Sequence, residues 1–190
     1  MKLSIKRDLQ KGFTLIELLI VVVILGILAA VVIPQLSGAT DDARVESLKT
    51  NLSAMRSSIA LYKQDHGDYP GVKLATGGGG CASGPGEGLA RTALAFAEQL
   101  TLFTSITGAA CSMKSATFKY GPYLTVSTTG VAGIPKNAIT EVNTIVFPTT
   151  SGNLAMVSAT TDSSGGWLYD ELTGKFIADD HSGTPFYDSY

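Results

Sequence analysis

Residues 11–34 read KGFTLIELLIVVVILGILAAVVIP, and this block sets the expectations for the rest of the chain. From Leu15 to Ile33 every residue is apolar or small except Glu17, and the stretch from Phe13 to Ile33 is 21 residues long. A helix of that length spans about 30 Å, which matches the hydrocarbon core of a bilayer. The block therefore predicts a transmembrane helix over residues 13–34.

Charges are distributed unevenly around this block. The first twelve residues carry four basic side chains and one acidic side chain, whereas the remaining residues carry ten basic and fifteen acidic ones. Basic residues before an apolar helix keep its N-terminus in the cytoplasm, so the rest of the chain is expected outside. The mildly acidic body has no cluster of Lys or Arg, and we therefore expect no nucleic-acid partner.

Two other interpretations of the block remain open on residue chemistry alone. A cleaved secretory signal would use Ser37-Gly38-Ala39 as its cleavage site, although the apolar run exceeds the about 7–15 residues usual for such signals. The second is a permanent membrane anchor. Glu17 argues against both, because a carboxylate in hydrocarbon costs on the order of a few kcal/mol and requires a partner. Since it lies near the helix start, Glu17 can alternatively reach the membrane interface.

The segment Lys11–Leu18, followed by the apolar run and Pro34, resembles the class III signal of type IV pilins and pseudopilins. The resemblance implies that a membrane prepilin peptidase removes residues 1–12 as a basic leader. It cuts between Gly12 and Phe13 and methylates the new amine of Phe13. The resemblance further implies that the helix leaves the bacterial inner membrane, helped by assembly machinery, and forms the core of a homo-oligomeric filament in the periplasm or at the cell surface.

The resemblance gives Glu17 and Pro34 roles in assembly that fit their chemistry. Cleavage creates a cationic amine on Phe13, and Glu17 of a neighbouring subunit can pair with it. Such a buried pair adds little net stability, but a mismatch leaves an unpaired charge, so the pair selects one register. Pro34 removes a backbone donor and predicts a kink or a locally melted turn near residues 26–34. The alternative is that one helix ends there and another begins.

Beyond the apolar block, residues 35–66 continue as an amphipathic helix. One apolar stripe recurs at helical spacing in this segment and comprises Leu48, Leu52, Met55, Ile59 and Tyr62. Gly67 suits a left-handed C-terminal cap, and Pro70 prevents continuation. Residues 62–70 also resemble the segment that ends the long helix in major pseudopilins of type II secretion, which are protein G-like.

Residues 67–190 are expected to form a globular head. A glycine-rich loop over residues 77–88 lacks a phosphate-loop motif and contains Cys81, and a second helix is predicted over about residues 89–106. Export favours a disulfide between Cys81 and Cys111, with two buried free thiols as the alternative.

The end of the chain has strand character. Five short segments are rich in β-branched and aromatic residues and are separated by turn residues: Thr117–Ser127, Thr140–Phe147, Asn153–Thr160, Gly166–Tyr169 and Lys175–Ala178. We expect one antiparallel sheet lying on the long helix. The predicted fold class is therefore α+β and type IV pilin-like.

No motif in the chain indicates catalysis, so we do not expect the protein to be an enzyme. His66 and His181 have no evident partners in sequence and are assigned to the surface. Carboxylates near the C-terminus, on turns rich in glycine and serine, suggest a calcium site: Asp162, Asp170, Asp179 and Asp180. A C-terminal calcium loop is common in the pseudopilins that the chain resembles, and solvated turn carboxylates are the alternative.

The sequence is compatible with three functions. The favoured one is a pseudopilin of type II secretion, which serves protein export across the outer membrane. A true type IV pilin, acting in adhesion, motility or DNA uptake, is the second. A membrane-tethered, exported binding domain is the more distant third.

Overall fold

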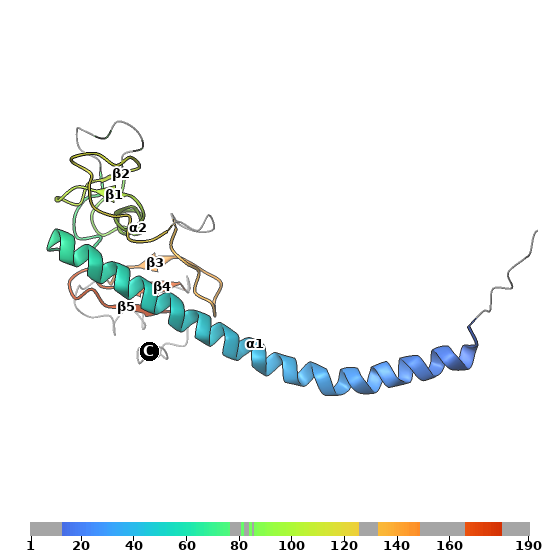
Figure 1. The fold of residues 1–190 in the computed structure, drawn as a ribbon. Coiled ribbons are helices and arrows are strands. Elements are labelled where there is room, and N and C mark those ends of the chain that lie inside the picture. The colour runs from blue at the N-terminus through green and yellow to red at the C-terminus, as the bar shows by residue number, and fades with distance from the viewer. Residues whose placement is uncertain are drawn as a thin grey trace, which may run out of the picture. The chain divides into compact units, whose positions relative to one another are not determined.

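The computed structural model describes residues 13–76, 81, 84, 86–125, 133–148 and 166–179, with backbone alone for residues 33–39 (Figure 1). The chain divides into two compact units, Met1–Ala43 and Arg44–Tyr190. Helix α1, Leu15–His66, contributes to both units. The combination of a long helix, a short helix and small sheets confirms the predicted α+β class.

In the first unit, α1 exposes its apolar side chains on all sides. The segment Leu15–Val32 has a mean hydropathy of 3.2 and is long and apolar enough to cross a membrane. The helix continues without interruption past Pro34. The predicted melted turn and the alternative of two separate helices are therefore wrong, because the loss of one donor leaves the hydrogen bonds of the neighbouring turns in place.

In the second unit, the apolar stripe of α1 is buried as predicted. Its side chains are between 0 and 2% exposed and comprise Leu48, Leu52, Met55, Ile59 and Tyr62. The helix ends where Gly67 takes a left-handed conformation, with φ of +77°. The Gly67 N–H donates to the carbonyl oxygen of Lys63 at 2.9 Å, so the predicted cap is confirmed.

Helix α2 spans Ala93–Thr101 and is shorter than the predicted residues 89–106. It begins late because the Thr92 hydroxyl accepts from the N–H of Ala95 at 3.1 Å and caps the helix there. It ends early because Leu102 turns to extended backbone and strand β1, Phe103–Thr104, follows at once.

The strands form two sheets instead of one. β1 pairs antiparallel with β2, Ala110–Cys111. The other sheet has the order β3-β4-β5, with β3 at Ile145–Val146, β4 at Trp167–Tyr169 and β5 at Phe176–Ala178. β3 and β4 are parallel, and β4 and β5 are antiparallel. The expectation of a single antiparallel sheet is wrong, because the long connection from β3 to β4 permits a parallel return.

Two predicted strands do not appear among the described residues. The described part of Thr117–Ser127 contributes only one bridge, between Tyr120 and Thr104. Pro122, which has no N–H to donate, limits further pairing there. The segment Asn153–Thr160 lies outside the described residues.

One core joins α1, α2 and the sheet β3-β4-β5 (Figure 1). Trp167, Tyr169 and Phe176 from the sheet pack in the same cluster as Phe96 of α2 and the α1 stripe. Leu168 and Ile177, which alternate with them along the strands, form a separate cluster. The period-two alternation of strand side chains explains this division.

A buried polar side chain of α2 connects this helix to the backbone of two loops. Gln99 of α2 is fully buried. Its Oε1 accepts from the N–H of Gly71 at 2.6 Å, and its Nε2 donates to the carbonyl oxygens of Lys73 and Gly108, each at 3.0 Å. Because buried backbone groups need partners, Gln99 holds both loops against α2.

Replacing this glutamine should destabilise the head. In Gln99→Leu one N–H and two carbonyls lose their partner, and a buried group left unpaired costs about 1–3 kcal/mol. Thermal unfolding of the full chain, followed by fluorescence of Trp167, measures the loss. Gln64→Leu on the exposed face of α1 is the control and should leave the melting temperature unchanged. Equal melting temperatures for the two variants would contradict this role of Gln99.

Candidate functional site

The start of α1 carries a reciprocal cap. The N–H and the hydroxyl of Thr14 donate to Oε2 of Glu17, at 2.9 and 2.7 Å. In return, the N–H of Glu17 donates to the Thr14 hydroxyl oxygen at 3.3 Å. This is a capping box, which satisfies donors that the first turn of a helix leaves unpaired. The carboxylate also lies at the positive end of the helix macrodipole.

Glu17 therefore has a local partner that the sequence reading missed. The signal was present, since a threonine followed three residues later by glutamate just before an apolar run is the capping-box pattern. Pairing with a neighbouring subunit and reaching the membrane interface were the two roles predicted for Glu17, and neither includes this cap. Of the other residues assigned to this region, Gly12 lies outside the described residues, and the Pro34 side chain is not described.

The apolar side chains that follow the cap are open to their surroundings. No residue of Leu15–Val32 is buried within the chain, and Phe13 just before it is 89% exposed. Soluble monomers rarely expose apolar patches of more than a few hundred Å². This surface therefore requires a lipid bilayer or other apolar helices around it.

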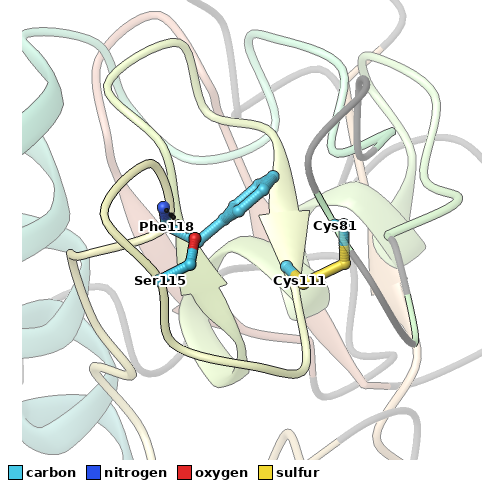
Figure 2. The surroundings of a disulfide bond; sticks show 4 residues. All are labelled: Cys81, Cys111, Ser115 and Phe118. Atoms are coloured by element: carbon cyan, nitrogen blue, oxygen red, sulfur yellow. Dashed lines mark hydrogen bonds between the residues drawn. A yellow bond between two sulfur atoms is a disulfide. The ribbon is translucent and has the colours of Figure 1, made fainter.

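The head contains the predicted disulfide. Cys81 and Cys111 are bonded, with a Cα–Cα distance of 5.7 Å. Figure 2 shows the bond joining Cys81 to the end of β2, with Ser115 and Phe118 on the loop that follows. The prediction is confirmed, and the alternative of two free thiols is wrong.

The described glycines after Cys81 are packed in place. Gly86 donates to the carbonyl oxygen of Ala110 at 2.8 Å, and Gly88 accepts from Ala75 at 2.8 Å. A Cβ on Gly88 would lie 2.3 Å from the backbone of Ala95. The carboxylate of Glu98 accepts from the N–H of Gly88 at 2.8 Å. Close backbone approach thus accounts for these glycines.

The predicted acidic cluster is not gathered among the described residues. Asp170 follows β4 and donates its backbone N–H to the carbonyl oxygen of Lys175, whereas Asp179 follows β5 and donates its backbone N–H to the carbonyl oxygen of Gly166. The two aspartates lie at opposite ends of the β4–β5 pair, about 13 Å apart along the strands. Asp162 and Asp180 lie outside the described residues. Within the described part of the chain, no three His, Cys, Asp or Glu residues are grouped to hold a metal ion.

The Asp170 side chain serves a turn instead. It accepts from the N–H of Leu172 at 3.1 Å and from the Thr173 hydroxyl at 2.7 Å. One ion shared by Asp170 and Asp179 does not fit this geometry, since calcium–oxygen distances are about 2.3–2.6 Å. Calcium binding that involves Asp162 or Asp180 stays a prediction.

His66 was assigned to the surface, and this assignment is wrong. His66 is only 8% exposed, and its ring stacks on that of Tyr62 with centroids 3.9 Å apart and planes within 5°. The reason is its position, because it lies four residues after Tyr62 and extends the buried stripe by one turn. Continuing the spacing of the stripe one step further would have found it. His181 lies outside the described residues.

Comparison with known proteins points to the same N-terminal region. Residues 7–33 match the family model described as the prokaryotic N-terminal methylation motif. Over 68 residues the chain is 46% identical to type II secretion system core protein G of Pseudomonas aeruginosa, covering 36% of this chain and 48% of the relative. The protein of the same name from Klebsiella michiganensis is 42% identical over 65 residues, 34% of this chain and 46% of the relative.

A relative with a different name is similar over a stretch of comparable length. The fimbrial protein of Neisseria meningitidis serogroup B is 44% identical over 71 residues, which cover 37% of this chain and 42% of the relative. The chain spans about half the length of the curated relatives it matches. No solved structure matches the chain significantly.

Proposed function

Because this chain belongs, through its N-terminal segment, to the type IV pilin and pseudopilin family, we propose that it is a structural subunit of a type IV filament. The observation that carries the proposal is the exposed apolar start of α1, which bears the methylation motif and is capped by Thr14 and Glu17. Such a surface has to be covered, and a bundle of identical helices covers it outside a membrane.

The proposed mechanism uses the residues at the start of α1. Prepilin peptidase cuts after Gly12 and methylates the amine of Phe13, which keeps its positive charge. Before assembly, the subunit resides in the inner membrane with its N-terminus in the cytoplasm and its head outside. Assembly machinery then transfers the helix from lipid to the filament core. There, Glu17 of a neighbouring subunit pairs with the Phe13 amine and sets the register. Pro34 is assigned to the same helix packing.

Within this class we propose a pseudopilin of type II secretion, so that the filament acts in export from the periplasm. The support is the similarity to type II secretion system core protein G from both Pseudomonas and Klebsiella. The Neisseria fimbrial protein supports a true pilin as the second candidate. A strain lacking the chain separates the two candidates. Retention of secreted proteins in the periplasm supports the pseudopilin, whereas loss of surface pili with normal secretion supports the pilin.

In this proposal the protein acts by assembling into a filament, so no residue of the chain is assigned to catalysis. A membrane-tethered binding domain that uses the motif only for export is the contrasting proposal. Electron microscopy of material overproduced in the native host distinguishes them. Filaments that contain the chain support the subunit, and their absence from cells that make and process the protein overturns it.

Processing gives the most direct prediction. The native protein should begin at Phe13 with a methylated amine, because leader, Gly12 and Glu17 together fit the peptidase signal. Mass spectrometry of the protein extracted from membranes measures the terminus. A strain without prepilin peptidase is the control and should keep residues 1–12. A mature terminus at Thr40, as cleavage after Ser37-Gly38-Ala39 requires, would contradict the prediction.

A further inference from the structure

The head has a groove beside β1 to which the assembly mechanism above assigns no role. It lies between the turn that joins β1 to β2, residues 105–109, and the segment of residues 116–120, and its volume is about 520 Å³. Ligand pockets in proteins usually enclose about 300–1,000 Å³. The groove is therefore large enough to take several side chains of a partner.

Hydrogen bonds hold both walls of the groove in place. In the turn, the N–H of Gly108 donates to the carbonyl oxygen of Ser105 at 2.9 Å, and the N–H of Ser105 donates to that of Ala109 at 2.8 Å. The opposite wall is joined to β1, because Tyr120 and Thr104 exchange two backbone bonds of 2.9 and 3.2 Å. Since the walls are formed in advance, little entropy is lost in ordering them when a partner binds.

The groove combines apolar surface with positive charge. Ile106 is 56% exposed on one wall, and the half-buried ring of Tyr120 lies on the other. Phe118, which is buried with its ring turned towards β2 (Figure 2), also lines the groove. The ammonium of Lys119 lies 5.1 Å from the centre of the Tyr120 ring. These features fit a partner that has aromatic side chains and negative charge.

One segment of the chain itself has that chemistry. Residues 180–190 contain three aromatic side chains and two aspartates, and they contain no Lys or Arg. Among the segments that lie outside the described residues, this is the one that carries aromatic side chains. Phe186, Tyr187 and Asp188 follow one another directly, so aromatic rings and a carboxylate can enter the groove together.

The groove and the start of this segment lie at different levels of the head. Tyr120 places the groove at the end of α1, because its ring lies 5.1 Å from that of His66. The carbonyl oxygen of Asp179 instead accepts from the loop of residues 136–137, which in turn accepts from Asn51 of α1. Asn51 and His66 lie about 22 Å apart along the helix.

This separation favours docking between two copies of the chain. The stretch from Asp179 to Phe186 spans at most about 25 Å even when fully extended. The distance along α1 uses almost all of that length before the segment crosses from β5 to the groove. An open helical assembly, by contrast, joins two different surfaces of each subunit, so one end of a head meets the other end of a neighbouring head.

We propose that the groove beside β1 binds residues 180–190 of a second copy of the chain, with their aromatic side chains in the groove and Asp188 near Lys119. The inference rests on the proposed filament function, because assembly supplies the second copy. It adds to that function a contact between heads, separate from the packing of the apolar helices. In a filament each segment is held beside its groove at an effective concentration on the order of millimolar, so modest affinity is sufficient.

A peptide of residues 180–190 tests the groove in the absence of filaments. With a fluorescent label at its start, it should bind saturably to the full chain in detergent micelles at concentrations up to about 1 mM. Phe186→Ser in the peptide should weaken binding about tenfold or more, because a buried aromatic side chain is lost. Lys119→Glu in the protein should weaken it about fivefold, whereas Lys114→Glu, also exposed but outside the groove, should leave it unchanged.

Two results of this experiment overturn the proposal. One is the lack of saturable binding at about 1 mM peptide, because the groove would then be empty in a filament as well. The other is equal binding by the native protein and the Lys119→Glu variant, because the peptide then binds elsewhere.

Cysteine cross-linking identifies the copy that supplies the segment. Cells should make two differently tagged variants together, Ile106→Cys and Phe186→Cys, and sheared filaments should contain a disulfide-linked dimer of both. The control pairs Phe186→Cys with Leu172→Cys, which is 61% exposed on the turn between β4 and β5 and should give no such dimer. A chain that carries both cysteines and closes only within itself overturns the assignment to a second copy.

The two experiments also separate this inference from the filament function. Filaments that form without the cross-link overturn the docking of residues 180–190 and leave the subunit assignment in place. Peptide binding by a chain that forms no filaments has the opposite meaning, because it overturns the filament proposal and keeps the groove as a site for this segment.

Discussion

Glu17→Ala is expected to insert into the membrane normally and to produce no filaments. Insertion is preserved because the variant removes an unfavourable charge from the apolar segment. Assembly fails because the Phe13 amine of a neighbouring subunit enters the filament core without a partner. Breaking a buried pair costs about 3–5 kcal/mol, which lowers the assembly equilibrium at least a hundredfold. Sheared filaments and the membrane-bound pool, quantified by immunoblot, measure both effects.

The matched variant for this experiment is Glu17→Gln. A capping box accepts glutamine in place of glutamate, so this variant keeps the hydrogen bonds to Thr14 and loses only the charge. If charge pairing drives assembly, both variants fail equally. Normal filament yield from Glu17→Gln, with failure of Glu17→Ala, would falsify charge pairing and assign Glu17 to helix capping.

Removing the disulfide is the second change with a large expected effect. Cys81 and Cys111 are separated by 30 residues, and a cross-link of that span stabilises by about 3–4 kcal/mol in the chain-entropy treatment. The double variant Cys81→Ser/Cys111→Ser should lose that amount. Most of the disorder should fall on Gly84 and residues 86–88, whose backbone bonds to Ala75, Ala110 and Ser112 depend on the bridge holding them in place.

Unfolding in urea, followed by the single tryptophan, measures this loss in the full chain. Trp167 is fully buried in the core, so its fluorescence reports on the head. Reductant provides the control, because it should destabilise the native protein and leave the double variant unchanged. Rapid alkylation of both cysteines in the unreduced native protein would contradict the bond itself.

The first part of the chain follows from local pattern. The apolar start of α1, its buried stripe and its cap at Gly67 depend on residues within a few turns of one another. Helical periodicity and capping act over that range, so sequence reading finds them. The disulfide could also be predicted from the sequence, because two cysteines in an exported chain allow one intramolecular bond.

The reading failed where partners lie far apart along the chain. β3 pairs in parallel with β4 across a gap from Val146 to Trp167, and no local pattern specifies that direction. Helix α2 ends early because β1 pairs with β2, whereas its late start is a local feature, the cap that Thr92 forms on Ala95. The burial of His66 follows from the spacing of the α1 stripe, but its partners Thr104 and Tyr120 come from later segments and could not be predicted.

The acidic residues show the same division. Asp170 and Asp179 are close in sequence, and proximity suggested one site. The hairpin separates them, because the chain leaves Asp170 at the end of β4 and runs back along β5 to Asp179, which lies beside the start of β4. Local sequence patterns therefore predicted α1 and its C-terminal cap at Gly67, where the contacts are local. Only the tertiary structure determined the sheets, the surroundings of His66 and the separation of these aspartates, because those depend on which distant segments pack together.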